Sequence, residues 1–223
     1  MSASREFGVP GIGFTPGGHV CALFYTDLQR DQILLPYIEA GLVAGDKCVC
    51  VVDSVPTADV LTGLRTDVDV DGCVASHQLD VRAPPEAYVR AGRFTTENVM
   101  DYWTTSVSSA LGPDHFPFFR ALGEMPAEWQ EGPERLNFFL FESELNRFPP
   151  GAHFILCLYN VARFGGSVVM NVLKTHPKVL LGGQVFENPV LSVPGQIPRR
   201  EPGSLRAEGG PKGPSARRRA LCS

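Results

Sequence analysis

HVCALFYTDLQRDQILLPYIEAGLVAGDKCVCVVD, residues 19–53, decides the fold class of this chain. An apolar run is followed by a short polar turn, an amphipathic segment that ends near Gly45, and a second apolar run. This order predicts a buried strand at His19–Tyr25, a helix, and a second buried strand at Lys47–Asp53. Strands that are apolar on both faces are typical of a parallel sheet covered by helices.

The turn between the first strand and its helix is where a β-α-β unit usually binds phosphate. Here the turn reads Tyr25-Thr26-Asp27-Leu28-Gln29-Arg30-Asp31. It has no glycine and no Gly-Lys pair, and it places two carboxylates where phosphate would lie. The residues therefore predict the scaffold of a nucleotide-binding protein without its phosphate loop.

The rest of the chain continues the alternation of strands and helices. Further helices are expected at 57–64, 95–111, 133–145 and 168–175. Further strands are expected around 75–79 and at 115–122, 154–159 and 178–181, with a loop at 123–126. Such alternation predicts a three-layer α/β/α fold, with a mostly parallel central sheet and helices on both faces.

Charge and composition divide the chain into a body and two ends. Residues 1–18 are rich in Gly and Pro and are expected to form an irregular arm, residues 19–194 one domain, and residues 195–223 a disordered basic tail. From Arg199 onward there are seven Lys or Arg and two Asp or Glu, so this end carries +5 and the first 198 residues carry −9. An acidic body argues against nucleic-acid binding by the folded part. The cluster Arg217–Arg219 could touch a membrane or nucleic acid, but a solvated tail is the favoured interpretation.

The chain shows no sign of export or membrane insertion. No apolar run is long enough to span a bilayer, and the N-terminus lacks the pattern of a signal peptide. Of six cysteines, three lie in strand-like apolar runs, at Cys48, Cys50 and Cys157. Buried free thiols of a reduced, cytoplasmic protein explain this pattern better than a disulfide framework does.

Ligands of doubly wound α/β folds bind at the carboxyl ends of the strands. This rule singles out polar residues that follow the predicted strands: Tyr25, Thr26, Asp53, Glu124, Asn160 and Arg163. A structural role is about equally plausible, with Asp53 capping a turn and Glu124 pairing with Arg163 or a backbone N–H. No nucleophile elbow or set of paired metal ligands accompanies these residues.

His19 and Cys21 carry the sharpest local chemistry. Alternation along a strand places both side chains on one face. An imidazole beside a thiol could bind a soft metal or a polar ligand, but two ligands alone do not make a metal site. Local context favours packing for this pair and for Cys157, and capping of a helix C-terminus for His176.

Six segments together resemble the MEDS domain, the methanogen/methylotroph sensory domain, over roughly residues 17–194. These segments are HVCALFY (19–25), AGLVAGDKCVCVVD (40–53), GRFTTENVMDYW (92–103), ALGEM with the later Trp129 (121–129), FESELN (141–146) and LYNVARFGGSVVMNVLKTHPKVLLGGQVFENP (158–189). The family's opening motif is His-x-Cys followed by an aromatic residue. His19 and Cys21 match it, Phe24 stands at the usual Tyr position, and Tyr25 follows.

The resemblance implies a degenerate relative of RecA/KaiC-type ATPases that perceives small organic compounds beside DNA-binding or signalling domains. We therefore predict a non-catalytic sensory domain that binds a small organic ligand and signals to a regulatory protein or a second copy. The predicted ligand-binding residues are His19, Cys21, Phe24, Tyr25, Glu124 and Arg163. No metal and no cofactor are predicted.

Two other functions stay open. One is a ligand-free interaction module in a partner-switching pathway such as those that control anti-sigma factors; a filled internal pocket would argue against it. The other is a divergent nucleotide-binding protein, which measurable nucleotide binding would favour.

Overall fold

A computed structural model describes residues 5–9, 12–65, 68–130, 134–149 and 151–189. The predicted basic tail lies outside the described residues. The strands of the central sheet are β3 (Gly18–Phe24), β4 (Lys47–Val51), β5 (Leu79–Arg82), β8 (Phe119–Glu124), β9 (His153–Asn160), β10 (Lys178–Leu181) and β11 (Gln184–Glu187). They lie in the order β11-β10-β3-β9-β8-β4-β5, and β11 is the one antiparallel member of this described sheet.

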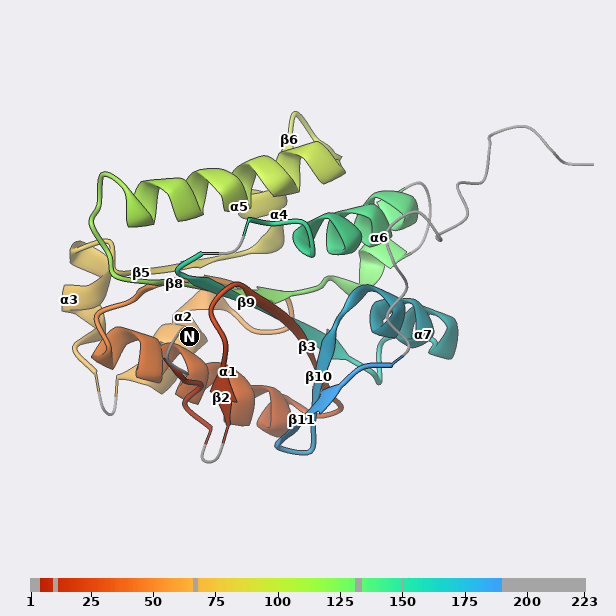
Figure 1. Cartoon of the computed structure of the whole chain (residues 1–223), viewed down its shortest axis with the longest axis horizontal. Helices are drawn as coiled ribbons and strands as arrows, with labels where there is room; N and C mark the ends of the chain where they lie inside the picture. Colours follow the sequence, from red (N-terminus) through yellow and green to blue (C-terminus); the bar gives the residue numbers. More distant parts are fainter. Residues whose placement is uncertain (1–4, 10–11, 66–67, 131–133, 150, 190–223) are drawn as a thin grey trace, which may run out of the picture.

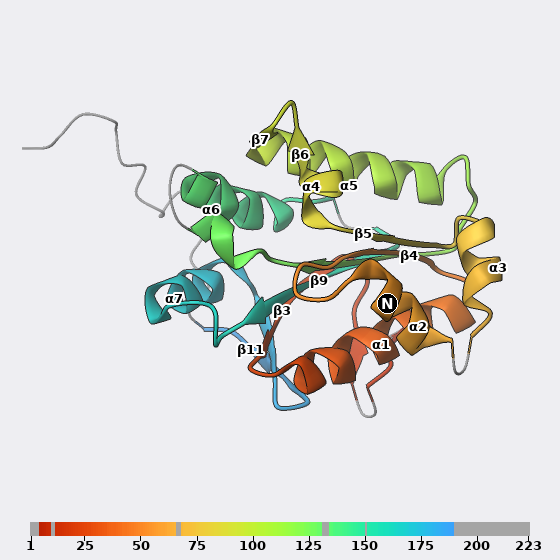
Figure 2. The same ribbon diagram turned by 180° about the vertical axis from the view of Figure 1, so that it is seen from behind.

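Helices cover both faces of this sheet (Figures 1 and 2). One layer is formed by α1 (Asp27–Val43), α2 (Thr57–Leu64) and α3 (Val70–Ala75), and the other by α4 (Pro84–Tyr88), α5 (Thr96–Leu111), α6 (Glu134–Leu145) and α7 (Gly166–Thr175). A short 3-10 helix, Ala127–Gln130, precedes α6. Alternate residues of each strand point to opposite faces of the sheet and belong to two separate hydrophobic cores. Cys21 belongs to the core under α5, α6 and α7, and Ala22 to the core under α1. The predicted three-layer, mostly parallel α/β/α fold is confirmed.

Helix α1 forms where the apolar spacing predicted it. Thr26 is its N-cap: the Thr26 hydroxyl accepts from the backbone N–H of Gln29, and the Gln29 side chain accepts from the backbone of Tyr25 and Thr26. This capping box satisfies donors that a helix otherwise leaves open at its start. The buried stripe of Leu34, Tyr37, Ile38 and Leu42 faces the sheet.

Two local predictions are wrong, and the strand expected at 115–122 begins only at Phe119. Residues 75–79 are not a strand, because Asp69 caps α3 through the N–H of Gly72 and the helix runs to Ala75. The strand begins only at Leu79, after His77 turns the chain with a φ of 58°. The loop expected at 123–126 is also wrong at its start, since Gly123 and Glu124 continue β8 in register with β9.

Several short elements lie where the sequence pattern predicted none. Helix α4 is followed by a hairpin of β6 (Val89–Arg90) and β7 (Arg93–Phe94), whose turn residues Ala91 and Gly92 both have positive φ. Such angles are those of a tight hairpin turn. At the end of the described chain, β11 folds back along β10 and forms the edge of the sheet.

The N-terminal segment, expected to be irregular, contains a small antiparallel pair, β1 (Arg5–Glu6) and β2 (Gly13–Phe14). Phe7 and Phe14 of this segment are buried in the core under α1. The domain limits at residues 18 and 194 stay predictions.

A buried ion pair ties this segment to the sheet. Arg120 of β8 donates to Asp46 at 2.8 Å and also to the backbone carbonyls of Tyr37 and Glu6. Arg5 reaches the second oxygen of Asp46 at 2.6 Å. Arg120 is 2% exposed and Asp46 is fully buried, so each charge depends on the other for its polar partners.

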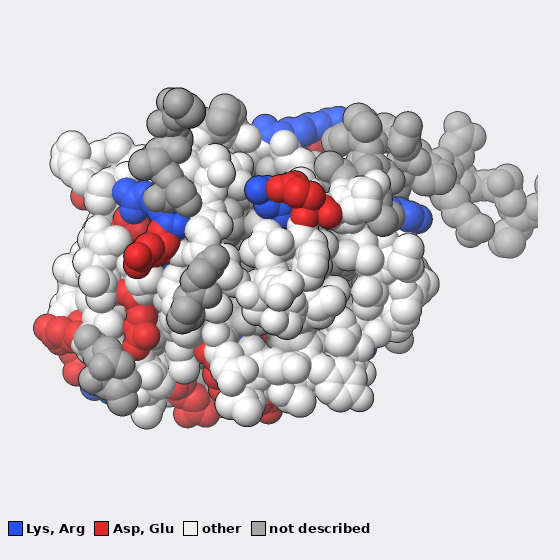
Figure 3. Space-filling model, turned by 60° about the horizontal axis from the view of Figure 1, so that its bottom comes forward, with Lys and Arg blue, Asp and Glu red and all other residues white. Residues whose placement is uncertain are grey.

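The face that carries α1 bears charged side chains in separate small groups (Figure 3). Basic and acidic side chains adjoin at several of these places, and no broad basic surface is visible among the described side chains on this face. None of the described helices is long and apolar enough to cross a membrane.

Candidate functional site

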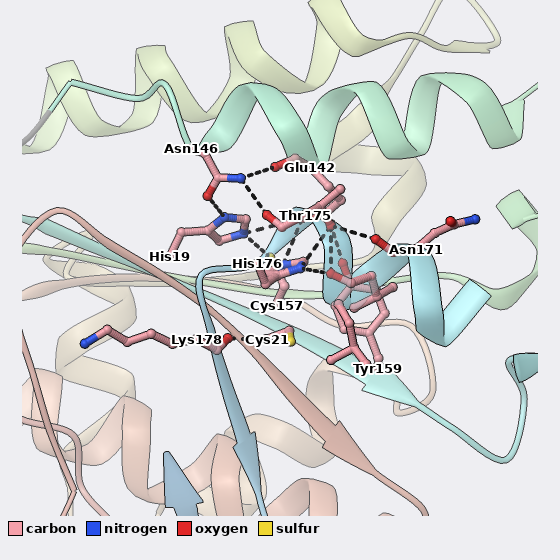
Figure 4. A network of polar contacts seen from close by, with 12 residues as sticks. His19, Cys21, Glu142, Asn146, Cys157, Tyr159, Asn171, Thr175, His176 and Lys178 are labelled. Atoms are coloured by element: carbon pink, nitrogen blue, oxygen red, sulfur yellow. Dashed lines mark hydrogen bonds and ion pairs between the residues drawn. The ribbon is translucent and has the colours of Figure 1, made fainter. Parts of the chain in front are cut away.

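Four side chains that could bind a metal converge beneath α6 and α7 (Figure 4). They are His19 of β3, Glu142 of α6, Cys157 of β9 and His176, which follows α7. Their ligand atoms all lie within 4.8 Å of one another, and all four side chains are buried.

The hydrogen bonds of the two imidazoles fix which nitrogens face the cluster. His19 Nδ1 lies 3.1 Å from the side-chain oxygen of Asn146, whose amide nitrogen donates to the carbonyl of Thr175. His176 Nδ1 lies 2.8 Å from the carbonyl oxygen of Val172. Both partners are acceptors, so each Nδ1 carries the proton and donates. In the neutral form of each ring, Nε2 then presents a lone pair to the centre of the cluster.

Glu142 supplies the negative charge of the cluster. Tyr159 donates to its Oε1 at 2.5 Å, while its Oε2 lies 3.4 Å from His19 Nε2 and 3.1 Å from His176 Nε2. Burial raises the pKa of Glu142, but the two imidazoles more than offset this effect and the pKa falls to about 2. Glu142 is therefore ionised.

The sulfur of Cys157 completes the group at 3.4 Å from His19 Nε2. Burial, together with the charge of Glu142, raises the pKa of this thiol well above its ordinary value. Burial likewise lowers the pKa of His19. The cluster therefore contains two imidazoles, a thiol and an ionised carboxylate.

The structure separates the residues that sequence reasoning grouped as one ligand site. His19 and Cys21 lie on the face under α6 and α7, and Cys21 contacts the carbonyl of Lys178 at 3.7 Å instead of joining the cluster. Phe24 points to the opposite core, under α1, and Tyr25 is 63% exposed. Five residues along a strand separate His19 from Phe24 by about 17 Å.

Glu124 and Arg163, the remaining two, lie at the carboxyl edge of the sheet. Glu124 accepts from the backbone N–H groups of Asp53 and Ser54, each at 2.9 Å, and from the Ser54 hydroxyl. Arg163 bridges Asp53 at 2.9 Å and Glu128 at 2.7 Å. Both side chains thus have structural partners. For Glu124 these include backbone N–H groups, as the structural interpretation of this residue expects.

A cavity of about 510 Å³ opens at the carboxyl end of β3, beside the start of α1 and the turn after β10. Phe24 and Tyr25 line it, so these two predicted site residues do come together. Most of the remaining wall is apolar; it comprises Val9, Leu23, Gln29, Gln32, Ile33, Val161, Leu180, Leu181, Gly182 and Gly183. Volume and lining are those of a small-molecule site.

Sequence reasoning missed most of the buried cluster. Sequence context favours packing for Cys157 and capping for His176, and the bond from His176 to Val172 does cap α7. Glu142 was not considered as a site residue. A carboxylate and an amide four residues apart, Glu142 and Asn146, directly after the apolar run 138–141 were the available signal.

Comparisons with known proteins agree with this architecture. The structure resembles a KaiC-like protein from Pyrococcus horikoshii OT3, with a TM-score of 0.57 and 14% identity over 80% of each chain. It also resembles the flagellar accessory protein FlaH from Methanocaldococcus jannaschii, with a TM-score of 0.53 and 10% identity over 86% of this chain and 92% of that one. These likenesses show the fold alone.

No curated protein matches the sequence. The model of the methanogen/methylotroph, DcmR sensory domain matches residues 18–177, and the chain therefore belongs to the MEDS family of sensory domains.

Proposed function

We propose that this sensory domain is non-catalytic and binds a small organic ligand in the cavity at the carboxyl end of β3. Ligand binding would be passed to a regulatory protein, which would control transcription or a related response. The observation that supports this proposal is a mostly apolar cavity of about 510 Å³ at the position where this fold class binds its ligands.

The start of α1 supports a ligand other than a nucleotide. In a phosphate site the first backbone N–H groups of the helix point at the anion. Here the N–H of Gln29 donates to the Thr26 hydroxyl, and the N–H of Arg30 to the Thr26 carbonyl. The Arg30 side chain, 4% exposed, is bound by Asp27, Asp31 and Ser54. The Arg30 guanidinium and the N–H of Gln29, a residue that lines the cavity, are thus used within the protein.

The β10–β11 hairpin offers a route from the cavity to a partner. Its turn, Leu181–Gly183, lines the cavity, and Gly182 and Gly183 have positive φ, a conformation that side chains disfavour. The same hairpin exposes the apolar side chains of Leu181, Val185 and Phe186. A ligand that contacts the turn would bias the position of these side chains, which a protein partner could read.

The proposal is tested by native mass spectrometry of the protein purified from its own host. A small molecule should travel with the wild-type chain and be absent from Ile33→Trp, whose larger side chain fills the cavity. Val43→Trp, on the same helix but at a side chain that is 79% exposed, is the matched control and should retain the molecule. A wild-type chain that carries no molecule would instead favour a ligand-free interaction module.

A further inference from the structure

We propose that His19, Glu142, Cys157 and His176 form a binding site for one transition-metal ion, with zinc as the best match. This site is separate from the cavity at the carboxyl end of β3, and the inference does not depend on what that cavity binds. Its ligands come from four distant segments, which the fold brings together at one place (Figure 4).

The distances within the cluster are those of a coordination shell. A tetrahedral site with metal–ligand bonds of about 2.0–2.3 Å has ligand-to-ligand edges of about 3.3–3.8 Å. Nε2 of His19 lies 3.4 Å from both the Cys157 sulfur and Glu142 Oε2, and Nε2 of His176 lies 3.1 Å from Glu142 Oε2. The remaining pairs are within 4.8 Å. Movements of a few tenths of an ångström in these side chains would complete the tetrahedron.

The surroundings hold three of the four ligands in the required orientation. Asn146 accepts from His19 Nδ1, the Val172 carbonyl accepts from His176 Nδ1, and Tyr159 donates to the far oxygen of Glu142. Metal-binding histidines almost always donate their second ring N–H to an oxygen in this way, which fixes the tautomer and aims the lone pair at the metal. The four residues are therefore not only close together: neighbouring groups also orient three of them toward a common centre.

The electrostatics of the cluster call for a cation at its centre. Glu142 Oε2 and His176 Nε2 are buried, and neither has a hydrogen-bond partner in the described part of the chain. In a neutral His176 that donates from Nδ1, the lone pair of Nε2 faces a lone pair of Glu142 Oε2 at 3.1 Å. Orphaned buried polar atoms are costly. A divalent cation would satisfy them together and would bind Cys157 as the thiolate.

The donor set selects the metal. Two imidazoles, one thiolate and one carboxylate suit zinc and are poor ligands for magnesium or calcium, which prefer oxygen. Four protein ligands leave no open position in a tetrahedral shell, which is typical of a structural site. The metal would therefore join β3 and β9 of the sheet to α6 and to the end of α7. Because all four side chains are buried, uptake and release need α6 or α7 to open.

The test uses the full chain and two probes, Zn²⁺ and Co²⁺. Elemental analysis of protein purified without chelator should find one zinc per chain. After stripping, Co²⁺ should give the visible bands of a tetrahedral ion and a near-ultraviolet thiolate-to-cobalt charge-transfer band. Cys157→Ala should lose the charge-transfer band. Cys21→Ala is the matched control, because Cys21 faces Cys157 in the strand register yet lies outside the cluster, and it should keep the band.

Stability supplies an independent readout if a variant folds poorly. The melting temperature of the stripped wild-type chain should rise on adding Zn²⁺, whereas Mg²⁺ should leave it unchanged. A folded wild-type chain with no zinc, no cobalt spectrum and no thermal shift would overturn the proposal. A charge-transfer band that persists in Cys157→Ala and disappears in Cys21→Ala would also overturn it, because the sulfur ligand would then be the wrong residue.

Discussion

Glu142 is a carboxylate in a helix whose neighbouring side chains belong to the hydrophobic core. One of its oxygens accepts from the Tyr159 hydroxyl, and the other lies 3.4 Å from His19 Nε2 and 3.1 Å from His176 Nε2. The Tyr159 hydrogen bond is short, at 2.5 Å, as bonds to charged acceptors are. Tyr159 therefore does more than fill space: it holds the carboxylate that the rest of the cluster faces.

We predict that Tyr159→Phe lowers the free energy of unfolding by about 1–3 kcal/mol, because Glu142 Oε1 would lose its donor while staying buried. Urea unfolding monitored by circular dichroism measures the change. Tyr25→Phe removes the same hydroxyl from a side chain that is 63% exposed and should change stability by less than about 0.5 kcal/mol. Equal effects of the two substitutions would show that the bond to Glu142 contributes nothing.

Residue-level reasoning from the sequence found one of the four converging side chains. His19 stands out in the sequence because it shares a strand face with Cys21 and because the family motif begins there. Its partners Glu142 and Cys157 are more than 120 positions away in the chain. No local sequence pattern encodes which helix crosses which strand at that distance. The sequence therefore pairs His19 with Cys21, the cysteine nearest to it in the chain. The strand-end rule also directed attention to the carboxyl edge, whereas His19 and His176 lie near the amino ends of β3 and β10.

At the scale of elements, prediction succeeded where periodicity is long and the ends carry caps. Thr95 caps α5 as predicted, and the bounds of α2 and β10 match the expected 57–64 and 178–181. It failed at short elements such as α3 and the β6–β7 hairpin. These are too short to show a period, and their ends depend on single contacts, such as the Asp69 cap.

The link between the N-terminal pair of strands and the sheet allows a prediction at this scale. Arg120→Met should lower the free energy of unfolding by about 3–5 kcal/mol, since Asp46 would stay buried without its main partner and the Glu6 carbonyl would lose a donor. Guanidinium denaturation would measure the loss of stability. Proteolysis of the N-terminal segment would measure how far the loss of the bond to Glu6 releases β1 and β2.

Arg65→Met is the matched control for this substitution. Arg65 pairs with Asp71 at 2.7 Å, as close as the buried pair, but the two side chains are 50% and 75% exposed. Breaking an exposed pair should cost no more than about 1 kcal/mol. If the two substitutions had similar effects, the buried pair would not be what fastens β1 and β2 to the body.

At the scale of the whole molecule, one strand connects two different chemistries. β3 carries His19, in the polar cluster under α6 and α7, near its start, and it ends at Phe24, in the wall of the apolar cavity. The first is closed and lined by nitrogen, sulfur and oxygen ligands, which suits a fixed ion that stiffens the fold. The second is open and lined by hairpin and helix, which suits a ligand that comes and goes. Under the two proposals above, stability and sensing could be altered separately.

The likeness to KaiC-like and FlaH structures is a likeness of fold, so nucleotide binding has to be judged on the site. At the start of α1 the N–H of Gln29 donates to the Thr26 hydroxyl, and Arg30 is bound by Asp27 and Asp31. A phosphate chain placed there would be repelled by these two carboxylates. We predict that calorimetry with ATP and magnesium detects no binding stronger than millimolar. Micromolar affinity that disappears on substituting residues 25–31 would contradict this, and it would mean that the loop rearranges to free the helix start. Micromolar affinity untouched by those substitutions would place a nucleotide elsewhere on the molecule, and the cavity beside Phe24 would be the first position to test.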